Sequence, residues 1–315
     1  QMNEMLIVFC IVKTSVNMKL SSEGVENVCQ CLHDFFHREY CRHHQGLGSM
    51  NRTVSRMVYC AAMLCTFLLI TSFSPGDGKR YLPNESFGFG ERLEFRVGYK
   101  FITAGTAYFH VLPEPVIRNG QQCYDVRFQV RSLQSLEWLY RVKDDYRTVL
   151  DVDGIFPYEF EQHIREGGYK RDFKATFDQV QNVARTTEGE FPVTPFIHDV
   201  VSAFYYVRTL DLQNKKKGEI IPLKNFFDRQ THDLGVKILG KQTIEVEAGT
   251  FRCIVIEPLV VEGGLFKADG KILIWVSDDE RKIPVKVATK IPIGSIDTEL
   301  TSYKGLRGPL QSLVQ

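Results

Sequence analysis

The sequence predicts a mainly β protein with an antiparallel curved sheet, arranged as an open barrel or a sandwich, and one buried helix. Apolar and charged residues alternate in many short segments, as along Leu93, Phe95 and Val97, which share one face. This alternation is typical of strands that are buried on one face only. Turn-forming dipeptides such as Asn119-Gly120 separate the segments at short intervals.

Each predicted strand is a run of strand-forming residues bounded by Gly, Pro, Asn or Asp. Before the helix, the predicted strands are 91–99, 106–112, 124–130, 140–151, 158–165, 169–177 and 180–187. After the helix, they are 219–227, 230–239, 241–248, 250–261, 271–277, 283–290 and 295–303. The short segment 133–140 is ambiguous, and one helical turn is expected there.

Residues 194–210 form the one helix that the sequence predicts. The first residue, Thr, can cap the helix, and the Pro that follows suits the first helical position because it has no N–H to leave unpaired. Val200, Phe204 and Val207 line one side at helical spacing, and apolar residues also occupy much of the other side. A helix that is apolar nearly all round is expected to be buried.

An apolar run at 58–70 indicates export. Arg52 and Arg56 give it a basic flank, small residues follow it, and it is shorter than the roughly twenty residues of a membrane-spanning helix. We therefore expect translation to begin at Met50 and a signal peptide to occupy 50–74. Cleavage of this segment and its retention as an anchor both stay open.

The remaining chain divides by position and composition. Residues 1–49 are expected to be a spurious or disordered N-terminal extension, the alternative being that this stretch is genuine. Residues 75–90 are rich in Gly, Pro and Ser and predict a linker, and 91–305 predict the β-rich exported domain. A loose tail is expected over 306–315.

The balanced charge of the chain bears on the kind of partner that the protein binds. The chain has 39 Lys and Arg against 38 Asp and Glu, a formal net charge of +1, which argues against a nucleic-acid partner.

Cys123 and Cys253 are the cysteines of the predicted exported domain. They are a candidate disulfide in an oxidising compartment, or two buried thiols. Cys123 falls in the polar register of its strand, where it is expected to be accessible.

Several short motifs follow one another in a fixed order along the predicted domain. They are Asp199-x2-Ser202-Ala203-x-Tyr205-Tyr206-x-Arg208, Ala248-Gly249-Thr250-Phe251-x-Cys253, Gly270-Lys271-Ile272-x-Ile274-Trp275-Val276-Ser277, Arg281-x-Ile283-Pro284-Val285 and Ile293-Gly294-Ser295-Ile296. Together they resemble a family of exported bacterial proteins, the domain of unknown function 3108, over roughly 89–304. The resemblance implies an exported β-rich domain, packed on a helix, without an established activity and without catalytic residues to transfer.

The candidate ligand-binding residues are Asp199, Ser202, Tyr206, Arg208 and Trp275. The first three fall close together on one helix face, and Arg208 points toward the apolar side. A charged group removed from water needs a partner, and a guanidinium suits a carboxylate or a phosphate. Arg208 therefore meets an anionic ligand in a cavity, pairs with a strand carboxylate, or extends its head into water. Trp275 belongs to the core or barrel wall, or is a platform for a ligand.

The sequence predicts no catalytic residue, no metal site and no cofactor. Ser202 lacks the Gly-x-Ser-x-Gly elbow of serine hydrolases, and the histidines of the predicted domain are scattered without metal-ligand spacing. A carboxylate pair for glycoside cleavage stays open, because acidic residues are abundant on the predicted strands.

The expected function is that of a non-catalytic exported protein of the periplasm or the inner face of the outer membrane. We expect it to bind a lipid or another hydrophobic ligand, because a curved sheet rich in Phe and Tyr can leave an apolar concavity. The alternatives are a structural or protein-interaction module of the cell envelope and a cell-wall-directed hydrolase. The expected partners are accordingly a hydrophobic small molecule or an envelope protein, with peripheral membrane association.

Overall fold

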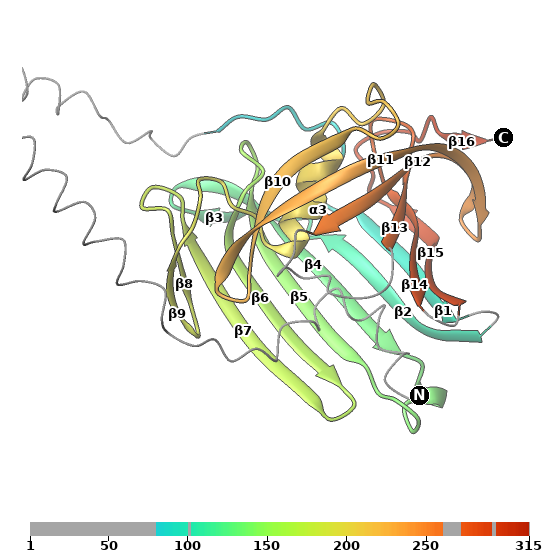
Figure 1. The fold of residues 1–315 in the computed structure, drawn as a ribbon, viewed down its shortest axis with the longest axis horizontal. Coiled ribbons are helices and arrows are strands. Elements are labelled where there is room, and N and C mark those ends of the chain that lie inside the picture. The colour runs from blue at the N-terminus through green and yellow to red at the C-terminus, as the bar shows by residue number, and fades with distance from the viewer. Residues whose placement is uncertain (1–79, 100–101, 261–271, 292–293, 315) are drawn as a thin grey trace, which may run out of the picture. The chain divides into compact units, whose positions relative to one another are not determined.

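The computed structural model describes residues 80–99, 102–260, 272–291 and 294–314. These residues form a 16-stranded antiparallel sheet and one α-helix (Figure 1), which confirms the predicted fold class. The predicted signal peptide and the extension before it lie outside the described residues.

Fourteen strands form the main path of the sheet, in the order β10-β11-β12-β13-β14-β15-β1-β2-β4-β5-β6-β7-β8-β9, while β3 pairs with β4 and β16 with β12. The strands of the first half are β1 (Arg92–Tyr99), β2 (Ile102–Val111), β3 (Val116–Arg118), β4 (Gln121–Ser132), β5 (Lys143–Asp151), β6 (Pro157–Glu166), β7 (Tyr169–Asp178), β8 (Val183–Thr186) and β9 (Gly189–Pro192). The second half contains β10 (Ile220–Phe227), β11 (Gln230–Val246), β12 (Gly249–Val260), β13 (Ile272–Ser277), β14 (Pro284–Ile291), β15 (Gly294–Lys304) and β16 (Leu313–Val314). The short 3-10 helix η3 (Gln134–Leu136) lies where one helical turn was expected.

The sheet curls until its two edges touch through side chains. The ring of Phe226, on edge strand β10, lies 5.9 Å from that of Phe177 on β7 and 6.1 Å from that of Phe191 on edge strand β9. Register irregularities interrupt β1, β5, β11 and β13, and such bulges bend a strand and increase its twist. Within the described ranges, no strand pairing joins β9 to β10, so the sheet stays open.

The long strand β11 replaces two predicted strands. The sequence predicted a break at Gly240, and the structure instead continues the strand through a register shift between Ile238 and Gly240. Gly240 has a φ of 122°, which a side-chain-bearing residue rarely adopts. The glycine therefore bends the strand without ending it.

Helix α3 (Val200–Thr209) packs inside the curled sheet. Ala203 and Val207 join a buried cluster with residues of β10 to β13, whereas Val201 and Tyr205 join a second cluster with residues of β2 to β8. Figure 1 shows β11 and β12 crossing over the helix, with the broad strands β4 to β7 behind it. The helix is thus buried on opposite sides, as its nearly all-round apolar pattern predicted.

The predicted start of this helix was wrong by five residues. Asp199, not Thr194, is the cap: its carboxylate accepts hydrogen bonds from the N–H groups of Val201 and Ser202 at 2.8 and 2.9 Å. The Ser202 hydroxyl accepts one from the Asp199 N–H at 2.9 Å. This reciprocal capping box satisfies helix N–H groups that are buried, so it defines the start more strongly than the Thr-Pro pair.

Two segments predicted to be loose are packed onto the sheet. In the predicted linker, Phe87 is fully buried and lies against the rings of Tyr124 and Tyr205 at 5.3 and 4.7 Å. In the predicted tail, β16 pairs with β12, and Ser312 is fully buried. Both predictions relied on local composition, which does not show that an apolar side chain finds a distant site to fill.

The two faces of the sheet differ in polarity. Burial alternates along strands such as β1 and β6, so one set of side chains faces the helix and the other faces solvent. In the part of the chain that the structure describes, no helix is both long and apolar enough to cross a membrane.

Candidate functional site

An apolar cavity lies between the concave face of the sheet and helix α3. Its volume is about 190 Å³, the space in which the centre of a water molecule can move. The described residues that line it are Phe95, Val97, Ala107, Phe109, Phe128, Val130, Asp144, Tyr146, Val200, Val201, Ala203, Phe204, Val207, Asn225, Leu234, Val236, Ile256, Pro258, Ile272, Ile274, Pro284, Val287, Thr289 and Thr298.

Helix α3 lines the cavity with the apolar side that the sequence predicted. Val200, Phe204 and Val207 recur at spacings of four and three residues, so they stand one above another on one side. All three line the cavity. The apolar side of α3 therefore forms one wall of the cavity.

Three phenylalanines stack along this wall. The Phe109 ring is 4.3 Å from that of Phe128 and 5.3 Å from that of Phe204, and both pairs are nearly parallel. All three side chains are only half-buried, although each faces the inside of the curled sheet. Aromatic rings that remain partly uncovered at a concave surface can contact an apolar ligand.

Four polar residues interrupt the apolar lining. They are Asp144, Asn225, Thr289 and Thr298. Asp144 is 1% exposed and accepts a hydrogen bond from the Arg165 N–H at 2.9 Å. Burial raises the pKa of Asp144 to about 6, against the opposing effect of hydrogen bonds from Arg165 and Glu166. The cavity thus carries a buried carboxyl group that keeps its proton to a higher pH than an ordinary aspartate does.

None of the five predicted ligand-binding residues lines this cavity. Arg208, which is fully buried, donates hydrogen bonds to both carboxylate oxygens of Glu91 at 2.7 and 2.8 Å. It also donates to the backbone oxygens of Ser86 and Arg281. Burial lowers the pKa of Arg208, but attraction to Glu91 outweighs this effect and leaves the pKa raised. Arg208 therefore pairs with the carboxylate that directly precedes β1, and both of its terminal nitrogens are engaged inside the protein.

Asp199 and Ser202 are engaged in capping α3. Asp199 also accepts a hydrogen bond from the Thr148 hydroxyl of β5 at 2.7 Å, which ties the start of the helix to the sheet. Burial raises the pKa of Asp199, although these hydrogen bonds oppose the shift. The polar groups of both residues are satisfied inside the protein, so they position the helix.

Tyr206 and Trp275 lie away from the cavity as well. The Tyr206 ring is 4.6 Å from the His198 ring, and the Arg80 guanidinium lies 5.2 Å from its centre. Trp275 follows Ile274 on β13, so alternation turns it to the opposite face, where its indole N–H donates to Gln242 Oε1 at 2.8 Å. Trp275 is thus part of the sheet wall.

Cys123 and Cys253 are free and buried, which contradicts the candidate disulfide. They lie on β4 and β12, and five strands separate these in the sheet order, whereas a disulfide needs Cα atoms within about 7 Å. Cys123 is also inaccessible, because its side chain is fully buried, contrary to the expectation from its polar register. Burial raises the pKa of each thiol to about 12. Among the described residues, no cluster of His, Cys, Asp or Glu is arranged to hold a metal ion.

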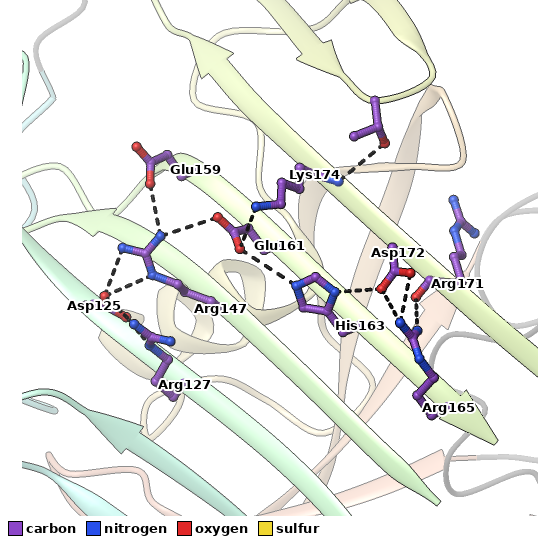
Figure 2. Close-up of polar contacts among 11 residues, drawn as sticks. Asp125, Arg127, Arg147, Glu159, Glu161, His163, Arg165, Arg171, Asp172 and Lys174 are labelled. Carbon is purple, nitrogen blue, oxygen red and sulfur yellow. Dashed lines mark hydrogen bonds and ion pairs between the residues drawn. The ribbon is translucent and has the colours of Figure 1, made fainter.

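The outer face of β4 to β7 carries a ladder of ion pairs (Figure 2). Asp125 accepts from Arg127 at 2.6 Å and from Arg147 at 2.9 Å, and Arg147 reaches Glu159 at 3.2 Å. Farther along the strands, Asp172 contacts His163 and Arg165, both at 2.7 Å; together these pairs are the outer ladder. The alternating charged residues of the sequence predicted this solvent-exposed face, but only the strand register shows which of these residues form ion pairs.

Comparison with known proteins finds a match to one protein family and matches to several solved structures of low sequence identity. The sequence model of the family described as "Protein of unknown function (DUF3108)" matches residues 94–301. No protein with a curated description matches the chain.

Three solved structures match the chain at low sequence identity. A β-barrel-like protein of the DUF1849 family from Brucella abortus is 10% identical, with a TM-score of 0.45, covering 69% of this chain and 97% of that one. A hypothetical protein from Chlamydia trachomatis is 9% identical, with a TM-score of 0.31, covering 73% and 93%. A protein from Bacteroides fragilis with a YmcC-like fold, described as an exported-protein candidate, is 9% identical, with a TM-score of 0.27, covering 71% and 98%.

Proposed function

The chain belongs to the DUF3108 family of proteins of unknown function, and from that premise we propose that it is a non-catalytic module that binds one hydrophobic ligand in the α3 cavity. We place it outside the cytoplasm, in the periplasm or on the inner face of the outer membrane. The apolar run at 58–70, with Arg52 and Arg56 before it, supports export.

The observation that carries this proposal is the composition of the cavity wall. Twenty of the lining residues have aliphatic or aromatic side chains, and the stacked Phe109, Phe128 and Phe204 leave ring surface uncovered. Burying apolar surface contributes roughly 25 cal/mol per Å². A filled core would have covered these rings with protein side chains.

The size of the cavity limits the ligand. At about 190 Å³, it exceeds the ~150 Å³ of an engineered apolar cavity that binds benzene, but it is smaller than the ~300–1,000 Å³ of typical drug-sized sites. We therefore infer that the cavity takes one small apolar molecule or the end of one acyl chain, whose remainder extends outward.

A binding experiment tests the proposal. Full-length protein stripped of lipid should bind the neutral dye N-phenyl-1-naphthylamine at one site, with a rise in fluorescence, and alkyl alcohols of several chain lengths should displace it. If neither the dye nor an alcohol of any tested length binds, the proposed function is wrong and an interaction module is favoured. Binding at many weak sites would also contradict a single cavity.

Matched variants locate the binding site. Ala107→Leu fills the cavity from β2 and should weaken dye binding at least tenfold. Thr106→Leu adds the same side chain on the opposite, exposed face of that strand, and should leave binding unchanged. Thr298→Phe, at a half-buried lining position, provides a second filling variant, and circular dichroism establishes that each protein is folded.

A further inference from the structure

The connection between β4 and β5 exposes large apolar side chains that nothing in the described protein covers. Trp138 is 82% exposed and Leu139 is 45% exposed. Ile102, which begins β2 at the same end of the sheet, is 62% exposed. We call these three residues the Trp138 tip. Tryptophan is on average a highly buried residue, so this degree of exposure points to a surface that contacts another apolar phase.

Backbone hydrogen bonds hold the tip in one conformation. The Leu133 N–H donates to the oxygen of Ala104 on β2 at 2.9 Å, and the Gly167 N–H, in the β6–β7 turn, donates to the Arg141 oxygen at 2.8 Å. Gly167 has a φ of 53°, and an added Cβ there would lie 2.8 Å from the Tyr140 ring. The connection is therefore braced on both sides, and Trp138 is presented outward on a firm support.

Basic side chains surround the tip. Arg141 and Lys143 follow it directly and are exposed, as is Lys170 at the start of β7. Glu137 is the acidic residue of the connection, and its carboxylate lies 3.6 Å from Arg141. The nearby acids Glu137, Asp145 and Asp172 each pair with an arginine. Lys143 and Lys170 therefore leave an excess of positive charge beside the tip, which complements an anionic surface.

The tip is adjacent to the end of the α3 cavity. Val130 and Asp144 both line the cavity and pair directly across β4 and β5. Trp138 lies in the connection that joins these same two strands, eight residues after one and six before the other. Thr298 also lines the cavity, and it too lies near this end, four residues into β15.

We propose that the Trp138 tip inserts into the surface of an anionic lipid bilayer and so brings the end of the cavity against the lipid. Exposed Trp beside Leu and Ile suits the interface between headgroups and acyl chains, because the ring is apolar and its N–H is polar. Arg141 and Lys143 reach the anionic headgroups from the sides of the tip. This docking does not depend on occupancy of the cavity, so it can succeed or fail separately from the proposed function.

Fluorescence of Trp138 itself tests the proposal. The chain contains two tryptophans, so the full-length Trp275→Phe variant leaves Trp138 as the sole reporter. On vesicles of phosphatidylglycerol and phosphatidylethanolamine, its emission should shift to shorter wavelength, and acyl-brominated lipids should quench it. This readout is local, so vesicle binding through another segment of the chain does not produce it.

Charge and apolar variants sharpen the test. Arg141→Gln with Lys143→Gln should weaken partition onto anionic vesicles about thirtyfold, since each basic residue near such a surface contributes about fivefold. Trp138→Ser should weaken binding, whereas Ile117→Ser should not. Ile117 is a matched control because it is 56% exposed on β3, at the opposite end of β4.

Two results would overturn the proposal. One is vesicle binding without any shift or quenching of Trp138. The other is a Trp138 shift that appears without vesicles and grows with protein concentration, which would assign the tip to contact between two copies of the chain. Loss of dye binding with Trp138 quenching intact would contradict only the proposed function.

Discussion

The Arg208–Glu91 pair and the outer ladder use the same chemistry in opposite surroundings. Arg208 and Glu91 have side chains that are 1% and 0% exposed, and they meet inside the packed protein. Arg147 and Glu159 in the outer ladder are 18% and 24% exposed, and the charges that flank them extend into solvent. Water therefore screens the ladder and leaves the buried pair almost unscreened.

This difference assigns different roles to the two sets of charges. The buried pair joins the C-terminal end of α3 to the residue before β1, and Ser86 adds hydrogen bonds from its hydroxyl to the backbone oxygens of Arg208 and Glu280. Removing one partner leaves an uncompensated charge inside the protein. The ladder instead keeps the outer face wet and contributes little per pair. Of the four predictions below, those on Glu91 and Arg147 test this contrast directly, and those on Asp144 and Asp199 extend it to other buried carboxylates.

The largest effect is expected for Glu91→Gln. It leaves the Arg208 charge buried without a counter-ion, so the free energy of unfolding should fall by about 3–5 kcal/mol in urea titrations. Glu94→Gln is the control, because Glu94 pairs with Arg92 on the exposed face of the adjoining strand β1, and should cost less than about 1 kcal/mol. Equal losses in the two variants would contradict the contrast.

A smaller effect is expected from the pH dependence that Asp144 causes. Its pKa is raised to about 6 in the folded protein, so the folded state holds this proton more tightly than the unfolded chain does. Stability due to Asp144 is therefore present below about pH 4 and is lost as pH rises through about 6. The loss should be roughly 2–3 kcal/mol, since one pKa unit corresponds to about 1.4 kcal/mol.

Asp144→Asn provides the measurement, because other groups titrate in the same range. The difference in unfolding free energy between the variant and the parent should widen in favour of the variant between about pH 4 and 6.5. A difference that stays constant over this window would show that Asp144 does not carry the raised pKa.

Asp199→Ala should have an intermediate effect of about 1–2 kcal/mol. It removes the acceptor for the N–H groups of Val201 and Ser202, and loss of an N-cap typically costs this much. Asp199→Asn keeps one acceptor oxygen and should lose less in the same urea titration. An alanine variant as stable as the parent would show that the capping box is dispensable.

The smallest effect is expected for Arg147→Gln in the outer ladder. Arg147 contacts Asp125 and Glu159, but Arg127 and Arg118 still contact these acids. The loss should be at most about 1 kcal/mol and should shrink further in 1 M salt. A loss as large as that of Glu91→Gln would contradict the contrast, because the ladder would then stabilise the fold as much as the buried pair does.

Much of the fold could be predicted because its signals are local. Alternation along β1, β4, β6 and β7 follows from which side chains avoid water, and turn dipeptides separate the strands. The side of the helix that includes Phe204 was identified in the same way, and it lines the cavity. The cap of α3 was missed, although Asp199 precedes Ser202 by three residues, a spacing that signals a capping box.

The candidate site was less predictable because its parts come from distant segments. The sequence showed that Arg208 needs a partner, but many strand carboxylates were available and Glu91 lies 117 residues away. The proposed ligand-binding residues were chosen for polar chemistry, whereas the cavity is made by apolar residues on eight strands and one helix. Trp138 received no role, because exposure is not visible in a sequence.

By itself, the sequence determined a β-rich domain with one buried helix, one wet face and a balanced charge, since these depend on residues close together in the chain. Only the tertiary structure decided where the sheet curls, which acid neutralises Arg208, and that Phe87 fills the core. Those outcomes depend on contacts between residues far apart in sequence. Such contacts form only when the register of every strand between them is fixed.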